Sequence, residues 1–391
     1  MGADLSSLVA IGLLIFYSTA SFVSAVYYRL CLKKHTGRVD ASVALILPLT
    51  GRHDSFQKLL GLLEQQTLRP KRLIIAIESD TDPAYPFALS LASSVSFPVS
   101  VVIAGLAESS SQKCHNLVAA ARQLDADEDY VVMLDADIAP PEWWLAAVIK
   151  PLARKQYDIV SGYRWQVPAG NRFAENLISF IDRAIALSVR PPGLTLLWGG
   201  TLAMPAGLIR KILADQVLEN TVSDDLMLAD YATKNNYRVL NRRVLLVPSR
   251  PPAGLLQVWN FAVRQLQIIK IYRPGLWLIE FVRVTLLIAC WLVMFTCSDN
   301  RIILYSSIAI VFSLLCMKHI VSLSIALCLG YRDRPDVRLS QFGLVFCRPL
   351  IDLFMFMVLC RSLCKREVQW SHVTYLVTAP NVVKIKTRKA C

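Results

Sequence analysis

The sequence predicts an α/β domain with a mostly parallel sheet, flanked by transmembrane helices at the N- and C-termini. Three observations predict this class. The 391 residues are 54% hydrophobic and 18% charged, a balance too apolar for an ordinary soluble protein. The longest apolar runs fall in two blocks, about residues 8–30 and 276–364. Between these blocks, apolar runs of strand length alternate with helical patterns.

Residues 1–39 are expected to form a membrane anchor with a basic flank. The run from Leu8 to Leu30 carries its first charge at Arg29 and is long enough to cross a bilayer as a helix. A cleavable signal peptide carries its basic residues before the apolar core, whereas here they follow it. Because basic flanks stay on the cytosolic side, we expect the following domain on the cytosolic face of a bacterial inner membrane or a Golgi- or ER-type membrane.

Residues 276–364 are expected to contain three further spans. A short turn at residues 298–301 and a charged loop at residues 331–338 separate them. Three spans would leave the basic tail, residues 365–391, across the membrane from the domain, which the positive-inside rule disfavours. One segment is therefore expected to be re-entrant or split, and the long run from Ile302 to Gly330 is the first candidate.

Residues 40–250 are expected to form the α/β domain. Expected strands cover residues 43–47, 72–77, 99–103, 130–134 and 157–161, and expected helices cover residues 55–66, 86–94, 112–124 and 142–155. Continuous β-branched runs that alternate with helices are typical of a parallel sheet covered on both faces. Ligands of such sheets bind beyond the C-terminal ends of the strands.

Two groups of carboxylates follow expected strand ends. They are Asp135 and Asp137 after the fourth strand, and Glu78, Asp80 and Asp82 after the second. Hard oxygen ligands of this kind suit Mg²⁺ or Mn²⁺ that bridges phosphates. The alternative is a plain loop in which Asp137 or a neighbour caps the helix that begins near Pro141.

Three later segments carry further candidates. The pair Gly199-Gly200 interrupts a strand-like run, which suggests close approach of the backbone to a ligand. Asp224 and Asp225 open a helix, where a carboxylate can also serve only to satisfy the helix dipole. Residues 251–275 are expected to form an interfacial amphipathic segment, with its apolar side chains on the membrane and Arg264 facing the domain.

In this order, the segments resemble the inverting family 2-like glycosyltransferases, and most closely the ceramide glucosyltransferase family (glycosyltransferase family 21) with its bacterial hopanoid-glycosylating relatives. The matching motifs are Asp82-Pro83-Ala84, Lys113 to Leu117, Asp135-Ala136-Asp137, Gly200 to Met204, Asp224-Asp225 and Arg264. The resemblance covers essentially the whole chain. It implies a Rossmann-like nucleotide-diphospho-sugar transferase (GT-A) domain between membrane helices.

Two motifs depart from the family pattern. The first aspartate of the family falls at Ser79 here, so Glu78, Asp80 and Asp82 all remain candidates for contact with the nucleoside. The last motif keeps only Arg264, because Gln265 occupies the place of the family tryptophan. The absent tryptophan disfavours a processive polysaccharide synthase and leaves the acceptor open.

The resemblance implies transfer of a sugar, most often glucose, from a UDP-sugar to the head-group hydroxyl of a membrane lipid such as ceramide, which would form a glycosphingolipid. Asp137, with Asp135, would hold Mg²⁺ or Mn²⁺ on the UDP diphosphate. Asp225, next to Asp224, would remove the proton of the acceptor hydroxyl. Arg264 and Lys113 would add positive charge at the diphosphate.

Several alternatives remain open at this stage. Hopanoid, diacylglycerol or sterol acceptors fit the same residues, as do other UDP-sugar donors. A polyisoprenyl-phosphate glycosyltransferase would share the sheet and the metal carboxylates but would need no base for an acceptor hydroxyl. A membrane protein that only binds a sugar nucleotide is a third alternative. The net charge of +13 fits anionic lipid surfaces and not nucleic acid, since no nucleic-acid-binding module occurs.

Overall fold

The computed structural model describes residues 5–33, 38–52, 54–189, 194–296, 300–364 and 366–389. The chain divides into two compact units, each assembled from segments that are distant in the sequence. The first, which we call the sheet unit, comprises Lys33–Trp165, Pro192–Arg250 and Arg366–Cys391. The second, the helical unit, comprises Met1–Leu32, Gln166–Pro191 and Pro251–Lys365.

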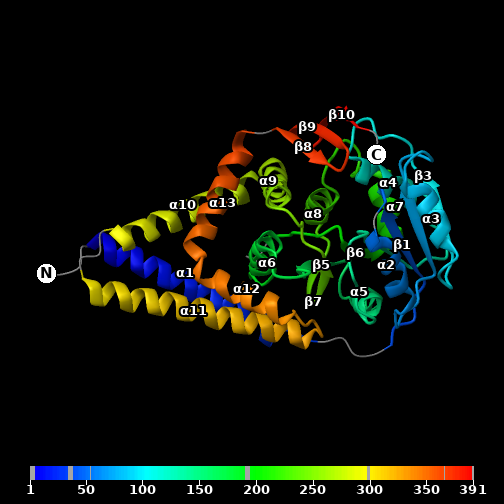
Figure 1. The fold of residues 1–391 in the computed structure, drawn as a ribbon. Coiled ribbons are helices and arrows are strands. Elements are labelled where there is room, and N and C mark those ends of the chain that lie inside the picture. Colours follow the sequence, from blue (N-terminus) through cyan, green and yellow to red (C-terminus); the bar gives the residue numbers. More distant parts are fainter. Residues whose placement is uncertain are drawn as a thin grey trace. The chain divides into compact units, whose positions relative to one another are not determined.

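The sheet unit is built on a seven-stranded sheet with the strand order β3-β2-β1-β4-β6-β5-β7 (Figure 1). The strands are β1 Val43–Pro48, β2 Arg72–Ile77, β3 Val99–Ile103, β4 Tyr130–Leu134, β5 Ile159–Gln166, β6 Thr201–Pro205 and β7 Val239–Ser249. Strands β3, β2, β1 and β4 are parallel, whereas β6 is antiparallel to β4 and β5. The predicted α/β class with a mostly parallel sheet is therefore confirmed.

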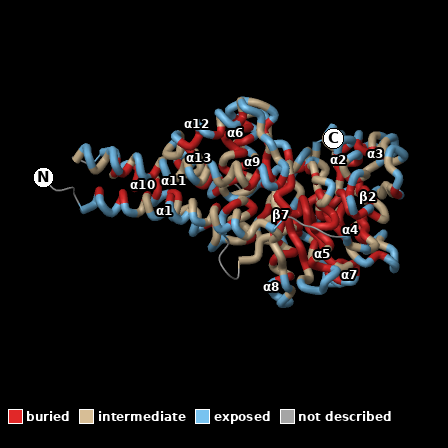
Figure 2. The backbone as a smooth tube through the Cα atoms, turned by 90° about the horizontal axis from the view of Figure 1, so that it is seen from below, coloured by how far each residue is buried: buried red, intermediate tan, exposed pale blue. Residues whose placement is uncertain are grey.

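Helices cover this sheet, as its uninterrupted apolar strands require. They are α2 Asp54–Glu64, α3 Ala84–Ala92, α4 Gln112–Ala121, α5 Trp144–Ala153, α7 Ala206–Ala214 and α8 Asp224–Lys234. Leu117, Ile209 and Leu228 of α4, α7 and α8 enter one hydrophobic cluster with Ile74 and Met133 of the sheet. Buried positions accordingly concentrate along the strands in Figure 2.

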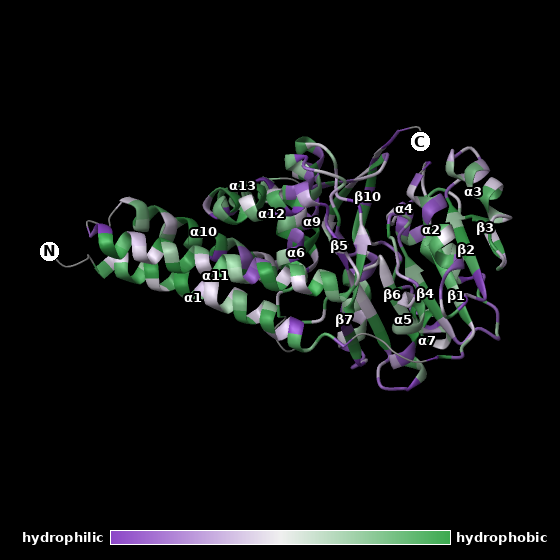
Figure 3. Ribbon diagram, turned by 60° about the horizontal axis from the view of Figure 1, so that its bottom comes forward, coloured by the Kyte–Doolittle hydropathy of each residue, from purple (hydrophilic) through white to green (hydrophobic). Residues whose placement is uncertain are grey.

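Within its described residues, the helical unit contains three helices that are long and apolar enough to cross a membrane. They are α1 Leu5–Leu30, α10 Pro274–Thr296 and α11 Arg301–Cys328, which are predominantly hydrophobic in Figure 3. Leu14, Trp291 and Val311 pack in one cluster between them. Large apolar side chains such as Phe16 and Ile302 are exposed on the same helices, as expected of a surface that lipid would cover.

The break among the C-terminal spans lies elsewhere than expected. The run from Ile302 to Gly330 does not split, because α11 continues to Cys328 as one helix. The break separates α12 Pro335–Phe346 from α13 Arg348–Cys364, which meet at 82°. Pro349 is the physical reason, since proline has no N–H to donate and its ring clashes with the carbonyl one turn earlier. These two helices form either one broken span or a re-entrant pair.

The remaining helices of this unit are α6 Phe173–Ala186 and α9 Leu255–Tyr272. The apolar residues of α9 were expected to lie on a membrane surface. Instead, Trp259 and Ala262 share a cluster with Phe354 and Val358 of α13. The amphipathic pattern of α9 therefore reflects packing against another helix at these positions, as amphipathic helices in globular proteins do.

Residues 365–391 were expected to form a basic tail, and no secondary structure was predicted for them. The described part of this segment is folded. It forms an antiparallel sheet of β8 Glu367–Trp370, β9 Val373–Ala379 and β10 Val382–Arg388. Along β9, buried Val373, Tyr375 and Val377 alternate with more exposed residues, the period of a half-buried strand. This C-terminal sheet belongs to the sheet unit, so the tail and the α/β domain lie on the same side of any membrane.

Gly162 in β5 provides a test of this packing. An added Cβ would lie 2.6 Å from the backbone oxygen of Leu245 in β7, so we expect Gly162→Ala to destabilise the protein by about 1–3 kcal/mol through overpacking. Gly61→Ala is the matched control, because a Cβ on this α2 glycine meets nothing within 4 Å and is expected to stabilise by about 0.5–1 kcal/mol. Thermal unfolding of the detergent-solubilised chain measures both, and equal melting temperatures for the two variants would contradict the packing.

Candidate active site

Lys113 joins two of the predicted carboxylates. Its Nζ lies 2.9 Å from Oδ1 of Asp135, at the end of β4, and 3.4 Å from Oδ1 of Asp224, at the start of α8. The lysine is the second residue of α4, whose N-terminus is fixed by Ser111, since the Ser111 hydroxyl accepts a hydrogen bond from the backbone N–H of Cys114 at 3.1 Å. Burial would lower the lysine pKa, but the charges of Asp135 and Asp224 outweigh it and raise the pKa above its ordinary value.

Asp224 is a buried carboxylate with a glycine packed against it. It is 1% exposed, and burial raises its pKa to about 6 against the opposing charge of Lys113. A Cβ at position 199 would lie 2.3 Å from Oδ2 of Asp224 and 2.9 Å from Nζ of Lys113. The predicted close approach at Gly199 is thus an approach to this ion pair.

Asp225 is held by the first turn of its own helix. Its Oδ1 accepts hydrogen bonds from the Ser223 hydroxyl at 2.5 Å and from the backbone N–H of Leu226 at 2.8 Å. These two hydrogen bonds fix the orientation of the carboxylate, and both are accepted by Oδ1 and not by Oδ2. Asp225 is half-buried, unlike its neighbour Asp224.

Asp137 lies at the rim of the site. The residue is exposed, yet desolvation by the surrounding protein and the negative charge of Asp135 raise the pKa of its carboxyl group to about 6. It caps no helix, because α5 begins at Trp144 with Trp143 in the capping position. The helix-start alternative for Asp137 is therefore wrong. Within the described parts of the chain, no group of three or more His, Cys, Asp or Glu side chains is arranged to hold a metal ion.

The three acidic residues after β2 have different environments. Asp80 is exposed. Asp82 is 2% exposed, and its Oδ1 accepts hydrogen bonds from the backbone N–H groups of Gly51 at 2.9 Å and Ala84 at 2.7 Å. Its Oδ2 is buried and has no hydrogen-bond partner among the residues that the structure describes. A buried oxygen without a partner is uncommon and costly.

Glu78 is bound by the C-terminal sheet. Its Oε1 lies 3.0 Å from Nε2 of His372, and its Oε2 accepts a hydrogen bond from Arg388 at 2.8 Å. Both oxygens of this buried carboxylate therefore contact residues of the C-terminal sheet, which are far from Glu78 in the sequence. Glu78 is poorly placed to contact a nucleoside directly.

The same sheet contacts the start of α4. Arg388 also donates to the side-chain oxygen of Gln112 at 3.0 Å, and the Tyr375 hydroxyl accepts from the backbone N–H of Gln112 at 3.0 Å. The Trp370 ring centroid lies 5.6 Å from Nζ of Lys113, within cation–π range. No role was predicted for Tyr375, Trp370 or Arg388, although the alternating pattern of residues 373–377 was a usable signal for a strand.

Arg264, the remaining predicted site residue, lies on α9 in the helical unit. Its guanidinium is 5.7 Å from the ring centroid of Phe261. The expected role of Arg264 at the diphosphate stays a prediction. Of the residues proposed from the sequence, the structure thus brings together Lys113, Asp135 and Asp224.

Solved structures similar to this chain include the following three. The mannosyltransferase PcManGT from Pyrobaculum calidifontis, in complex with GDP-Man and Mn²⁺, is 14% identical, with a TM-score of 0.46 over 90% of this chain and 99% of that chain. Glucosyl-3-phosphoglycerate synthase from Mycobacterium tuberculosis, with Mn²⁺, UDP and glucosyl-3-phosphoglycerate, is 14% identical, with a TM-score of 0.38 over 61% and 85%. S. aureus TarS 1–349 is 11% identical, with a TM-score of 0.37 over 89% and 100%.

No curated protein sequence matches the chain. The sequence model of glycosyl transferase family 21, in contrast, matches residues 10–382. This match runs from the first apolar helix through the α/β domain and the later apolar helices into the C-terminal sheet. Its extent, together with the mostly parallel sheet of a GT-A domain and the membrane-type helices, shows that the chain belongs to glycosyl transferase family 21.

Proposed function

We propose that the protein transfers a sugar, glucose by family resemblance, from a UDP-sugar to the head-group hydroxyl of a membrane lipid, with ceramide as the first candidate. Family membership supports a nucleotide-sugar glycosyltransferase. The observation that carries the proposal is the Lys113 ion pair with Asp135 and Asp224, next to the oriented carboxylate of Asp225. It lies where the ligands of α/β sheets bind.

The donor would be held by Asp82, Asp135 and Asp137. Uracil presents one N–H group, and the buried Oδ2 of Asp82, which has no partner in the described chain, would accept it. Asp137, with Asp135, would hold Mg²⁺ or Mn²⁺. Carboxylate oxygens are hard ligands, and an ion held by these two would take its remaining oxygens from the diphosphate. When bound, the metal would neutralise the charge that grows on the departing UDP.

Asp225 would be the base. Asp224 is unsuited to this role, because it is buried and forms an ion pair with Lys113. The proton of the acceptor hydroxyl would pass to Asp225 as the hydroxyl oxygen bonds to the anomeric carbon. The bond between that carbon and the phosphate oxygen breaks in the same displacement, and UDP leaves with the bonding electron pair. The configuration at the anomeric carbon is inverted.

The helical unit supports a lipid acceptor. If α10 and α11 each cross the bilayer, they return the chain to the side on which it entered. The bent pair α12 and α13 must then also return to that side, because the C-terminal sheet belongs to the sheet unit. The basic flank after α1 favours the cytosol for this side. A cytosolic active site on a chain anchored in the membrane would have access to both soluble UDP-sugar and insoluble lipid.

Expression in a host that lacks glycolipids tests the proposal directly. We expect mass spectrometry of the lipid extract to show one new hexosylated lipid, with ceramide hexoside formed when ceramide is available. A hexosylated hopanoid, sterol or diacylglycerol would replace ceramide as the acceptor. Membranes incubated with labelled UDP-sugars that never label a lipid would contradict the transferase proposal itself.

The Asp225→Asn variant tests the base. The amide keeps the size and one acceptor oxygen of the carboxylate but cannot take a proton at neutral pH, so we expect kcat for lipid glycosylation to fall by about 10²–10⁴-fold, with little change in KM for UDP-sugar. Glu219→Gln is the control, because it removes a carboxylate outside the site that is 3.9 Å from Arg122. Normal transfer by Asp225→Asn would favour a phosphate acceptor, which needs no base.

Arg388→Ala tests the contribution of the C-terminal sheet to donor binding. The substitution leaves Glu78 buried without its arginine and frees Gln112, the neighbour of Lys113. We expect KM for UDP-sugar to rise by about tenfold, the scale of one lost hydrogen bond to a charged group, with a smaller effect on kcat. Lys386→Gln, which removes an exposed cation from the same strand, should leave KM unchanged. An unchanged KM for Arg388→Ala would show that the sheet only covers the domain.

A further inference from the structure

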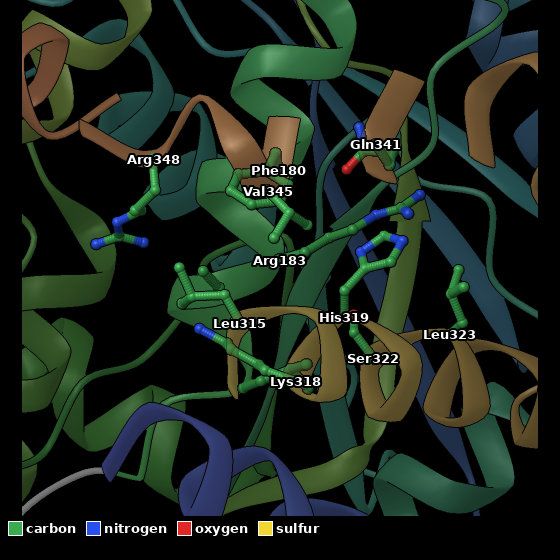
Figure 4. A pocket seen from close by; sticks show the side chains of 12 residues that line it. Phe180, Arg183, Leu315, Lys318, His319, Ser322, Leu323, Gln341, Val345 and Arg348 are labelled. Atoms are coloured by element: carbon green, nitrogen blue, oxygen red, sulfur yellow. The ribbon is translucent and has the colours of Figure 1, made fainter. Parts of the chain in front are cut away.

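The helical unit contains a pocket, partly open to the surface, that the proposed reaction does not use. It is formed by α6, α11, α12 and the start of α13 (Figure 4). Apolar side chains make up much of its lining, including Phe180, Leu187, Leu315, Leu323 and Val345. Three cations, Arg183, Lys318 and Arg348, line it as well. Such cations are unusual in an otherwise apolar helix bundle.

Two of the three cations already have carboxylate partners. Arg183 pairs with Asp333 at 2.6 Å, and Arg348 pairs with Asp352 at 2.8 Å. Both carboxylates are almost fully buried, so each pair is close to neutral as a unit. These arginines therefore line the pocket without adding net charge to it.

Lys318 is the exception. It lies in the second half of α11, one of the helices long and apolar enough to cross a membrane. Its Nζ donates a hydrogen bond to the hydroxyl of Ser21 on α1 at 2.6 Å. No carboxylate in the described chain forms a salt bridge with Lys318. Glu280 forms its ion pair with the nearby Arg283. Among the three lining cations, Lys318 is thus the one whose printed contact is a hydroxyl and not a carboxylate.

His319, the next residue of α11, also lines the pocket and has a ring nitrogen that can form a further hydrogen bond. Its Nε2 is buried and has no hydrogen-bond partner in the described part of the chain. Figure 4 shows the imidazole ring on the side of the pocket where Arg183 and Gln341 lie, while Lys318 and Arg348 lie toward the other side. A ligand in the pocket would therefore meet one unpaired cation and one unpaired ring nitrogen.

We infer that this pocket binds the phosphodiester head group of an anionic membrane phospholipid. One phosphodiester carries one negative charge, which matches the one unpaired cation, and its oxygens accept hydrogen bonds from ammonium and imidazole N–H groups. The leucine, valine and phenylalanine side chains of the lining offer contact to acyl chains, which a free phosphate ion does not have. The inference does not depend on the proposed transfer reaction, whose first candidate acceptor, ceramide, carries no phosphate.

Native mass spectrometry of the full-length protein, released from detergent after mixing with phosphatidylglycerol or phosphatidylcholine, tests the inference. Phosphatidylglycerol is the anionic probe, and phosphatidylcholine has the same phosphodiester with its charge cancelled by choline. We expect the wild type to retain one phosphatidylglycerol at about tenfold higher affinity, the scale of one charged hydrogen bond. Lys318→Met should lose this preference, and Lys318→Arg should retain it.

Arg338→Gln is the matched control for overall charge. It removes an exposed cation from α12 that does not line the pocket, and it should retain the lipid as the wild type does. Equal retention of the two lipids by the wild type would overturn the inference even if Lys318→Met failed to fold. It would also be overturned if Lys318→Met bound phosphatidylglycerol normally, or if millimolar inorganic phosphate displaced the lipid. No UDP-sugar is present, so failure here is separate from failure of the transferase proposal.

Discussion

The arrangement of the candidate site depends on one buried ion pair network, in which Lys113 lies between Asp135 and Asp224. Two carboxylates close together repel each other, and burying them costs free energy unless a cation compensates. Lys113 supplies this compensation and thereby joins three elements, the end of β4, the start of α4 and the start of α8. Gly199 is part of the same constraint, because any larger residue would collide with the pair.

The acidic residues around this network differ in burial and in hydrogen-bond partners. Asp224 is committed to Lys113, whereas Asp225, one residue further along the same helix, is oriented by Ser223 and its own backbone and keeps one oxygen outside those bonds. Asp137 lies at the exposed rim. Neighbouring carboxylates thus differ in burial and partners, which allows one to hold the architecture and another to perform chemistry.

Charge compensation also organises the helical unit. Arg183 with Asp333, Arg348 with Asp352 and Arg283 with Glu280 are each paired within the described chain. An unpaired charge among apolar helices is costly, so such a charge usually marks a ligand or a pathway. Lys318 stands out against this background. The same principle that explains Lys113 in the sheet unit therefore points to a bound anion in the helical unit.

The sequence by itself determined the parallel strands, their helices and the long apolar helices, because each produces a local pattern of apolar residues. It also placed Asp135 and Asp137 at a strand end, and the family motifs singled out Lys113 and Asp224. Only the tertiary structure decided that Lys113 lies between two carboxylates, that Pro349 ends a helix with a sharp bend, and that Glu78 is held by Arg388, 310 residues away. Contacts of this kind join distant segments, and a local pattern carries no information about which distant segment an element will meet.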